Sequence, residues 1–470
     1  MSGLKQFLDC LGSALCEYAT AALARLVPFE TALLEVAKAT HRHTSALNPA
    51  QVRAALREIV SSPAETVELA VQDAIYDIRP EVPEEFRETL LQYLEMLPEI
   101  ARQALRRPGD MDGVSVPEQF QIRRAEDWLL FLPDRLPSFR PGDQPAGVDN
   151  WRVETLRGLG PHSEVWEGYD DDQPELSPAC LKFVTDARLR AGFRKHEALL
   201  RRILDLDVFL GLIPLRSAYL QSSPPCLEYV QLHGYDLANL MNDARWRGDR
   251  PRPDQAATIA RRIARVVGKL HQLERRVVHR GLKPSNILLS PTTEGKVSVW
   301  VSDIGWGEIT APLSHQRLDV SQALRRAMRG SHAALYASPQ TKMGLPPDPR
   351  DDVYSIGVIW YQLLRQDPTA AAPDDVAWAA DLRRHGFSDG QASLMMSCLA
   401  DDPNDRPADG LILADMIAAN SSILRGNDHG SGTIRIQGSA IVEALPADGD
   451  ERPRLFVRPD PLDPDDAFPD

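Results

Sequence analysis

Apolar residues recur every three to four positions through the first hundred residues, which is the period of an amphipathic helix. Those nearest the start are Phe7, Leu11, Leu15 and Tyr18. Asn48-Pro49 has the pattern of a helix start, with Asn48 as the N-cap and Pro49 in the first turn. The same period returns over residues 84–107, where Pro98 should kink or break the helix. These patterns predict an all-α domain over residues 1–107.

The pattern changes twice after this domain. Residues 108–147 are rich in proline and enclose an apolar patch at 128–132 that is too short to fold alone. We expect a linker that lies along the next domain and docks through this patch. From about Trp151 the apolar period becomes two, which indicates strands, and a buried strand over 179–184 carries Lys182. Helical periods dominate after about residue 234.

Composition narrows the possible partners. The chain has 470 residues and is 43% hydrophobic, enough to bury a core in most of its length. With 67 acidic against 53 basic residues its net charge is -14, which disfavours nucleic acid and anionic membrane surfaces as partners. Residues 426–470 are rich in Gly, Asp and Pro, and we expect a mostly disordered acidic tail there.

The sequence also bears on redox chemistry and location. Its five cysteines form no C-x-x-C pair, so neither a disulfide scaffold nor a zinc site is expected. The first residues lack the basic start and long apolar run of a signal peptide, and no apolar segment is long enough for a membrane span. We therefore expect a cytoplasmic protein.

Four motifs that could take part in binding or catalysis follow one another along the chain. A glycine turn at residues 158–165 reads GLGPHSEV, and such turns let the backbone approach a phosphate closely. Lys182, inside its apolar strand, needs either an anion or a path to solvent. Residues 279–289 read HRGLKPSNILL, and Asp303-Ile304-Gly305 follows the strand-like run 297–301.

Taken together, these motifs resemble the protein kinase family, in its bacterial branch similar to eukaryotic serine/threonine kinases. The family's signatures are a glycine-rich loop, a strand lysine, an H-R-D-L-K-P-x-N catalytic loop and a D-F-G metal motif. The resemblance covers roughly residues 148–425. It implies an α+β, bilobal protein kinase fold, with a small β-rich lobe and a helical lobe, preceded here by the all-α domain.

The resemblance also implies ATP and Mg²⁺ as ligands. Lys182 is expected to hold the α- and β-phosphates and to pair with Glu197, and Lys283 to lie near the γ-phosphate. Mg²⁺ would be held by Asn286 and Asp303, whose oxygens suit this hard cation. The residues expected around the phosphates, the adenine and the hinge are Gly158, Gly160, Val165, Cys180, Leu227, Glu228, Val230 and Leu288.

Three departures from the family pattern affect the expected chemistry. Gly281 stands where the family has its catalytic aspartate, and the loss of a general base typically costs ~10²–10⁴ in rate. Pro161 removes one backbone N–H from the phosphate loop. Gln340 replaces a glutamate that in the family pairs with an arginine matching Arg406, and it can still hydrogen-bond without charge assistance.

These observations leave three functions open. The first is a pseudokinase that binds Mg·ATP and acts as a switch or scaffold, with a protein partner on the helical domain. The second is an active but slow serine/threonine kinase in which another group orients the substrate hydroxyl. The third is an interaction protein that binds no nucleotide. Lys182, Asn286 and Asp303 argue against the third, and Gly281 argues against the second.

Overall fold

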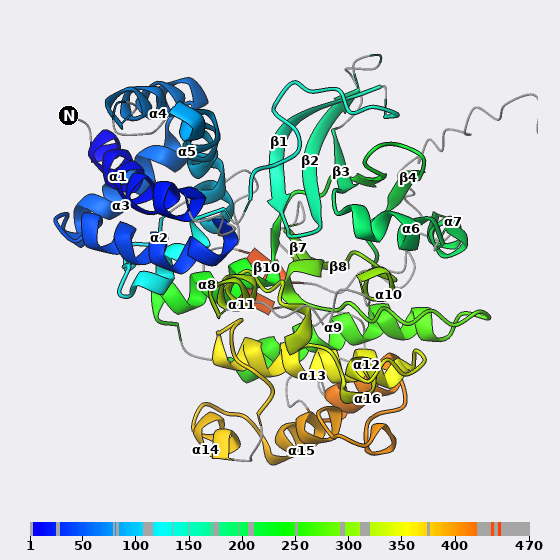
Figure 1. The fold of residues 1–470 in the computed structure, drawn as a ribbon. Coiled ribbons are helices and arrows are strands. Elements are labelled where there is room, and N and C mark those ends of the chain that lie inside the picture. Colours follow the sequence, from blue (N-terminus) through cyan, green and yellow to red (C-terminus); the bar gives the residue numbers. More distant parts are fainter. Residues whose placement is uncertain are drawn as a thin grey trace, which may run out of the picture.

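The computed structural model places a helical domain beside a two-lobed body (Figure 1). It describes residues 3–24, 29–78, 80, 84–106, 116–133, 135–148, 150–170, 172, 178–195, 197–204, 211–249, 252–291, 297–310, 320–373, 377–420, 434–436 and 440–442. The helical domain is made of α1 (Gly3–Ala24), α2 (Phe29–Thr44), α3 (Pro49–Ser61), α4 (Ala64–Ile78) and α5 (Glu84–Ala104). The predicted all-α region is therefore present.

Two local predictions about these helices can be compared with the structure. Asn48 caps α3: its side chain accepts a hydrogen bond from the Gln51 amide at 2.9 Å, and the Gln51 side chain accepts one from the Asn48 amide at 2.8 Å. The predicted helix start is thus confirmed. Pro98 was expected to kink or break the last of these helices. Helix α5 continues through Pro98, so it does not break there.

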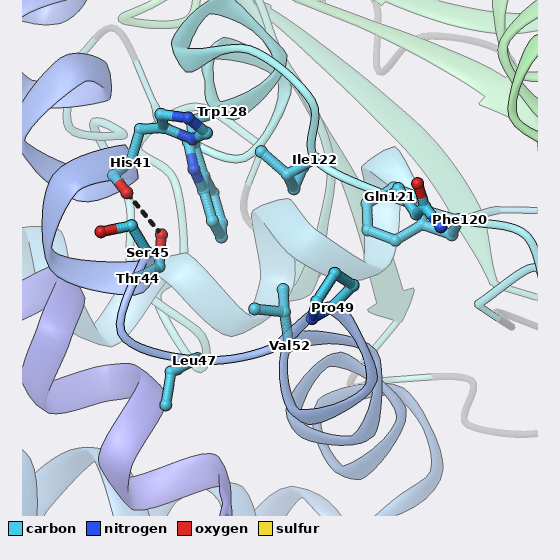
Figure 2. A pocket seen from close by; sticks show the side chains of 10 residues that line it. All are labelled: His41, Thr44, Ser45, Leu47, Pro49, Val52, Phe120, Gln121, Ile122 and Trp128. Atoms are coloured by element: carbon cyan, nitrogen blue, oxygen red, sulfur yellow. Dashed lines mark hydrogen bonds between the residues drawn. The ribbon is translucent and has the colours of Figure 1, made fainter.

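The linker folds back onto the helical domain. Its short 3₁₀ helix η2 (Ala125–Leu130) buries Trp128, whose ring centroid lies 5.6 Å from that of Phe7. Figure 2 shows Trp128 beside the turn that joins α2 to α3, where side chains from both segments surround a cavity of about 80 Å³. The apolar patch, which was expected to dock on the domain that follows, instead packs mainly in the buried cluster of the helical domain that precedes it, together with Met328.

The small lobe is an antiparallel sheet with the order β1-β2-β3-β5-β4. Its strands are β1 (Trp151–Leu159), β2 (Ser163–Asp170), β3 (Ala179–Val184), β4 (Leu215–Tyr219) and β5 (Cys226–Val230). The short helices α6 (Ala187–Lys195) and α7 (Glu197–Leu204) follow β3. Trp166 and Phe183 of the sheet share a buried cluster with Ile100 of α5, so the helical domain packs directly on this lobe.

The large lobe is mostly helical. A smaller sheet of β6 (Tyr235–Asp236), β7 (Ile287–Pro291) and β8 (Val297–Val301) lies between it and the small lobe. Its helices are α8 (Leu237–Arg247), α9 (Pro253–His271), α10 (Trp306–Thr310), α11 (Val320–Met328), α12 (Pro339–Lys342), α13 (Pro349–Arg365), α14 (Ala377–Arg383), α15 (Asp389–Cys398) and α16 (Gly410–Ala419). Helix α13 is buried along almost its whole length, as its apolar sequence predicts. The chain thus has the expected bilobal α+β architecture.

Of the expected acidic tail over 426–470, the structure describes two short antiparallel strands, β9 (Ile434–Ile436) and β10 (Ala440–Val442). The rest of that prediction lies outside the described residues.

Candidate active site

A cavity of about 960 Å³ lies between the two lobes. Ligand sites in proteins typically enclose ~300–1,000 Å³, so this volume suits a nucleotide-sized molecule. Most of the residues singled out in the sequence line this cavity: Gly158, Gly160, Val165, Cys180, Lys182, Val230, Lys283, Asn286, Leu288 and Asp303. Residues that are more than a hundred positions apart in the chain therefore meet around one space.

Four of the selected residues do not line this cavity. Leu227 of β5 is buried in an apolar cluster with residues of α6, α7 and β4, and the carboxylate of Glu228 accepts a hydrogen bond from the Tyr219 hydroxyl at 2.8 Å. Glu197 begins α7. Gly281 lies in the loop beneath the cavity, beside His279. Their expected roles in ATP binding and catalysis stay predictions.

Lys182 forms the central ion pair of the cleft. Its Nζ lies 2.5 Å from Oδ2 of Asp303, and both side chains are buried. The same Nζ lies 4.2 Å from the ring centroid of Trp306, a favourable cation–π position. Burial would raise the pKa of Asp303, but the charge and hydrogen bond of Lys182 hold it below its usual value. The structure thus describes a pair between Lys182 and Asp303, and the expected pairing of Lys182 with Glu197 stays a prediction.

The catalytic loop is held in a strained shape by one buried carboxylate. Arg280 has a φ of 52° and Asp303 a φ of 64°, the left-handed region that non-glycine residues seldom adopt. Asp352 accepts hydrogen bonds from the amides of His279 and Arg280, both at 2.8 Å, and contacts the His271 ring at 3.0 Å. These bonds compensate the strain and fix the loop that carries residue 281.

Asn286 is anchored in the same loop. Its Nδ2 donates to the carbonyl of Gly281 at 2.9 Å, which orients the amide of a side chain that is itself buried. Asn286 and Asp303 both line the cavity. Two oxygen donors of this kind suit Mg²⁺, which takes few protein ligands and completes its shell with phosphate and water oxygens.

Lys283 lines the cavity, and its side chain is half-buried there. Burial lowers the pKa of its ammonium to about 8, the nearby charge of Asp303 raises it, and those of Lys182 and Arg326 lower it further. An ammonium in this position gains strongly from an anionic ligand, because the ligand would neutralise an unfavourable buried charge.

The space beside Gly281 that a side chain would occupy is taken by the backbone of Gly307 in α10. A Cβ built on Gly281 would lie 3.1 Å from the amide nitrogen of Gly307 in α10, tighter than most such contacts. A Cβ built on Gly307 would lie 2.0 Å from the carbonyl oxygen of Arg280. The two glycines therefore let α10 pack directly on the catalytic loop.

The segment that follows Asp303 is held in place from several sides. Arg325 of α11 donates from Nε to the carbonyl of Leu132 at 2.7 Å, and Arg329 donates to the carbonyl of Leu130 at 2.5 Å. The linker therefore binds α11 and the residue just beyond it, in the segment that follows Asp303. At the end of this segment, Arg406 donates to Oε1 of Gln340 at 2.8 Å, which confirms the predicted contact.

The helical domain contributes a wall of the cavity that the sequence did not reveal. The residues concerned lie at the end of α5 and just beyond it: Glu99, Arg102, Gln103, Ala104 and Arg106. Gln103 donates from Nε2 to the carbonyl of Leu156 at 2.6 Å, which ties α5 to β1. Burial and the nearby charge of Arg157 lower the pKa of Arg106. No motif marks these residues, because their spacing is that of any amphipathic helix.

More than two fifths of the chain is similar to a known protein family. Residues 215–417 match the protein kinase domain family. The serine/threonine-protein kinase PknD of Chlamydia pneumoniae is 25% identical over 238 residues, which cover 46% of this chain and 24% of the relative. The serine/threonine-protein kinase pkn2 of Myxococcus xanthus is 28% identical over 302 residues, covering 60% of this chain and 34% of the relative. The matches thus span about a quarter to a third of these relatives.

A solved PknI kinase domain from Mycobacterium tuberculosis, in a double-mutant form, is 17% identical, with a TM-score of 0.46 over 60% of this chain and 99% of that one. The family match and the bacterial relatives define the class that the chain resembles: residues 215–417 are similar to the protein kinase domain family. The relatives named above are bacterial serine/threonine-protein kinases. No helix within the described residues has the length and apolar character needed to cross a membrane.

Proposed function

We propose that the protein binds Mg·ATP in the cleft between its lobes, has weak or no phosphotransfer activity, and acts as a signalling switch or scaffold. The observation that carries this proposal is an asymmetry within one cavity. Lys182, Asn286 and Asp303 converge there, whereas position 281 has no side chain and is covered by Gly307. The groups that would hold the nucleotide are present, and the group that would take the substrate proton is missing.

The residues present fit the nucleotide. Lys182 and Lys283 place two cations where the phosphates would lie, and Asn286 and Asp303 offer oxygen ligands for the metal. When bound, Mg²⁺ would neutralise part of the phosphate charge. Lys182 is already paired with Asp303, so the apo cleft keeps both groups aligned without leaving either charge unpaired. Val165, Cys180 and Leu288 supply apolar contacts for the adenine.

Weak catalysis follows from two features of the loop. Glycine at 281 can neither orient a substrate hydroxyl nor accept its proton. In addition, α10 packs on this loop through Gly307, so it covers the place that a phosphoacceptor would approach. An active kinase with a substitute base is the alternative, and phosphotransfer assays separate the two.

The proposed role as a signalling switch is supported by the contact between the linker and α11. Met328 and Leu324 of α11 pack in the same apolar cluster as the helices of the N-terminal domain. A protein partner that binds the helical domain would therefore act on α11, which follows α10 along the chain. This partner and the cytoplasmic location are part of the proposal.

The experiment that tests nucleotide binding is a thermal unfolding titration with ATP, with and without Mg²⁺. At 100 times its Kd, ATP should add about 2.7 kcal/mol to the free energy of unfolding. Asp303→Asn should remove the metal-dependent part, because it takes the charge from the metal ligand while keeping its shape. Asp389→Ala, at an exposed carboxylate on the far lobe, is the control and should change nothing. If Asp303→Asn keeps the full metal-dependent shift, the metal role is wrong; if ATP gives no shift, the interaction protein is favoured.

A further inference from the structure

One residue of the linker reaches the glycine-rich loop from outside the small lobe. Arg135 donates from Nε to the carbonyl of Gly160 at 2.9 Å and from Nη2 to the carbonyl of Ser163 at 3.2 Å. These two residues flank the tip of the loop, and the Gly160 amide donates to the Ser163 carbonyl at 2.9 Å, which closes the turn. One guanidinium therefore joins both sides of the hairpin that would cover the phosphates.

The guanidinium is itself held by a buried carboxylate. Arg135 donates from Nη1 to Oε1 of Glu164 at 2.6 Å, and Glu164 is fully buried. The same oxygen accepts the Ser138 amide at 2.7 Å, and the second oxygen accepts Nε1 of Trp166 at 3.0 Å. Because each carboxylate oxygen has a donor, the fork of Arg135 is held in one orientation.

The opposite side of the loop tip is also fixed. The carbonyl of His162 accepts the amides of Thr185 at 3.1 Å and Asp186 at 3.3 Å, and the His162 ring lies 2.9 Å from Asp186. Arg135 reaches this side as well, through a hydrogen bond from Nη2 to the Thr185 hydroxyl at 3.3 Å. The loop is thus anchored through its carbonyl groups. Because each peptide unit is planar, a held carbonyl also orients the N–H of the following residue.

We propose that Arg135 is a positioning residue of the nucleotide site, which presets the glycine-rich loop for the phosphates of ATP. This inference rests on the proposed nucleotide binding. The C=O and N–H of a trans peptide point in opposite directions, so the Ser163 carbonyl held by Arg135 fixes the N–H of Glu164, and the His162 carbonyl held by Thr185 and Asp186 fixes the N–H of Ser163. Pro161 has no N–H to offer, which makes the orientation of the remaining groups more important. A preset loop lowers the ordering cost that phosphate binding would otherwise carry.

The test compares Arg135→Lys with wild type by calorimetric titration of ATP and of adenosine. Lysine keeps a positive charge beside Glu164, but its single ammonium cannot span the two carbonyls. We expect the Kd for ATP to rise about tenfold, equivalent to ~1.4 kcal/mol. The Kd for adenosine should not change, because adenosine has no phosphate for the loop to bind. Arg140→Lys is the matched control: it lies in the same linker with a mostly exposed side chain, and should leave both constants unchanged.

Each outcome decides the proposal. Equal losses for ATP and adenosine, or a lowered melting temperature with unchanged affinities, would make Arg135 a purely structural residue and overturn the inference. If Arg135→Lys does not fold, Glu164→Gln takes its place: it removes the charge that holds the guanidinium and should weaken ATP selectively by a smaller factor. If the wild-type protein binds neither ATP nor adenosine, the proposed function itself is refuted. If Arg135→Lys binds ATP as tightly as wild type does, only the positioning role is refuted.

Discussion

Replacement of Gly281 by aspartate tests the missing base and the packing of α10 in one experiment. The new carboxylate would stand where the family has its general base, so phosphotransfer should rise by at least ~10²-fold, the lower end of the range for such groups. The new Cβ would also meet the Gly307 amide at 3.1 Å, the Gly307 Cα at 3.5 Å and Nδ1 of His279 at 3.6 Å. Helix α10 must therefore move by a few tenths of an ångström.

The steric part can be estimated and measured separately. Overpacking of this kind costs ~1–2 kcal/mol in a packed interior, which corresponds to a fall of several degrees in melting temperature for a domain of this size. Gly281→Ala carries the same Cβ without the carboxylate, so both variants should lose similar stability. Only Gly281→Asp should gain activity, measured as transfer from ATP to the protein itself and to a mixed serine/threonine peptide library.

Two results would refute this reasoning. If Gly281→Ala gains as much activity as Gly281→Asp, the packing of α10 is the limit and the absent base is not. If wild type already phosphorylates itself briskly and Gly281→Asp changes nothing, another group orients the hydroxyl and the pseudokinase proposal is wrong.

Two further predictions concern pH and stability. Because the pKa of Lys283 is lowered to about 8 in the folded protein, ATP affinity should fall up to about tenfold from pH 7 to pH 9, as the ammonium loses its proton. The unfolded chain then binds more protons than the folded one, so the free energy of unfolding of the apo protein should rise with pH above about 8. Lys283→Arg should abolish both trends, and a flat pH profile of wild-type affinity would contradict this role. Asp352→Asn should lower the free energy of unfolding in urea by ~2–4 kcal/mol, since it removes the charge that holds the strained Arg280; a loss below ~1 kcal/mol would show that the loop is held by other contacts.

Much of the site could be predicted from the sequence because kinase chemistry places particular residues at short, ordered spacings. Lys182 alone in an apolar strand, the loop with Lys283 and Asn286, and Asp303 after a strand each show a local conflict between polarity and burial, and such conflicts mark functional positions. The contact between Gln340 and Arg406 was also correctly predicted, from the family pattern and the hydrogen-bonding capacity of glutamine.

Other features depend on which segments meet in space. Lys182 pairs with Asp303 and lies over the ring of Trp306, and both contacts join segments more than a hundred positions apart in the chain. Gly307 had no motif around it, yet its lack of a side chain is what allows α10 to rest on the catalytic loop. Pro98 was expected to kink or break its helix; the break does not occur, because a helix packed on its neighbours tolerates one missing hydrogen bond.

The sequence by itself determined the helical domain, the bilobal kinase fold and the chemistry gathered in its cleft, since these follow from periodicity and from residue types at fixed spacings. Only the tertiary structure decided that the helical domain and linker help to build that cleft. Arg135 and the end of α5 have ordinary local patterns, and their roles come from contacts with the glycine-rich loop and β1. Such long-range contacts depend on how separate elements pack, and local propensity carries no record of them.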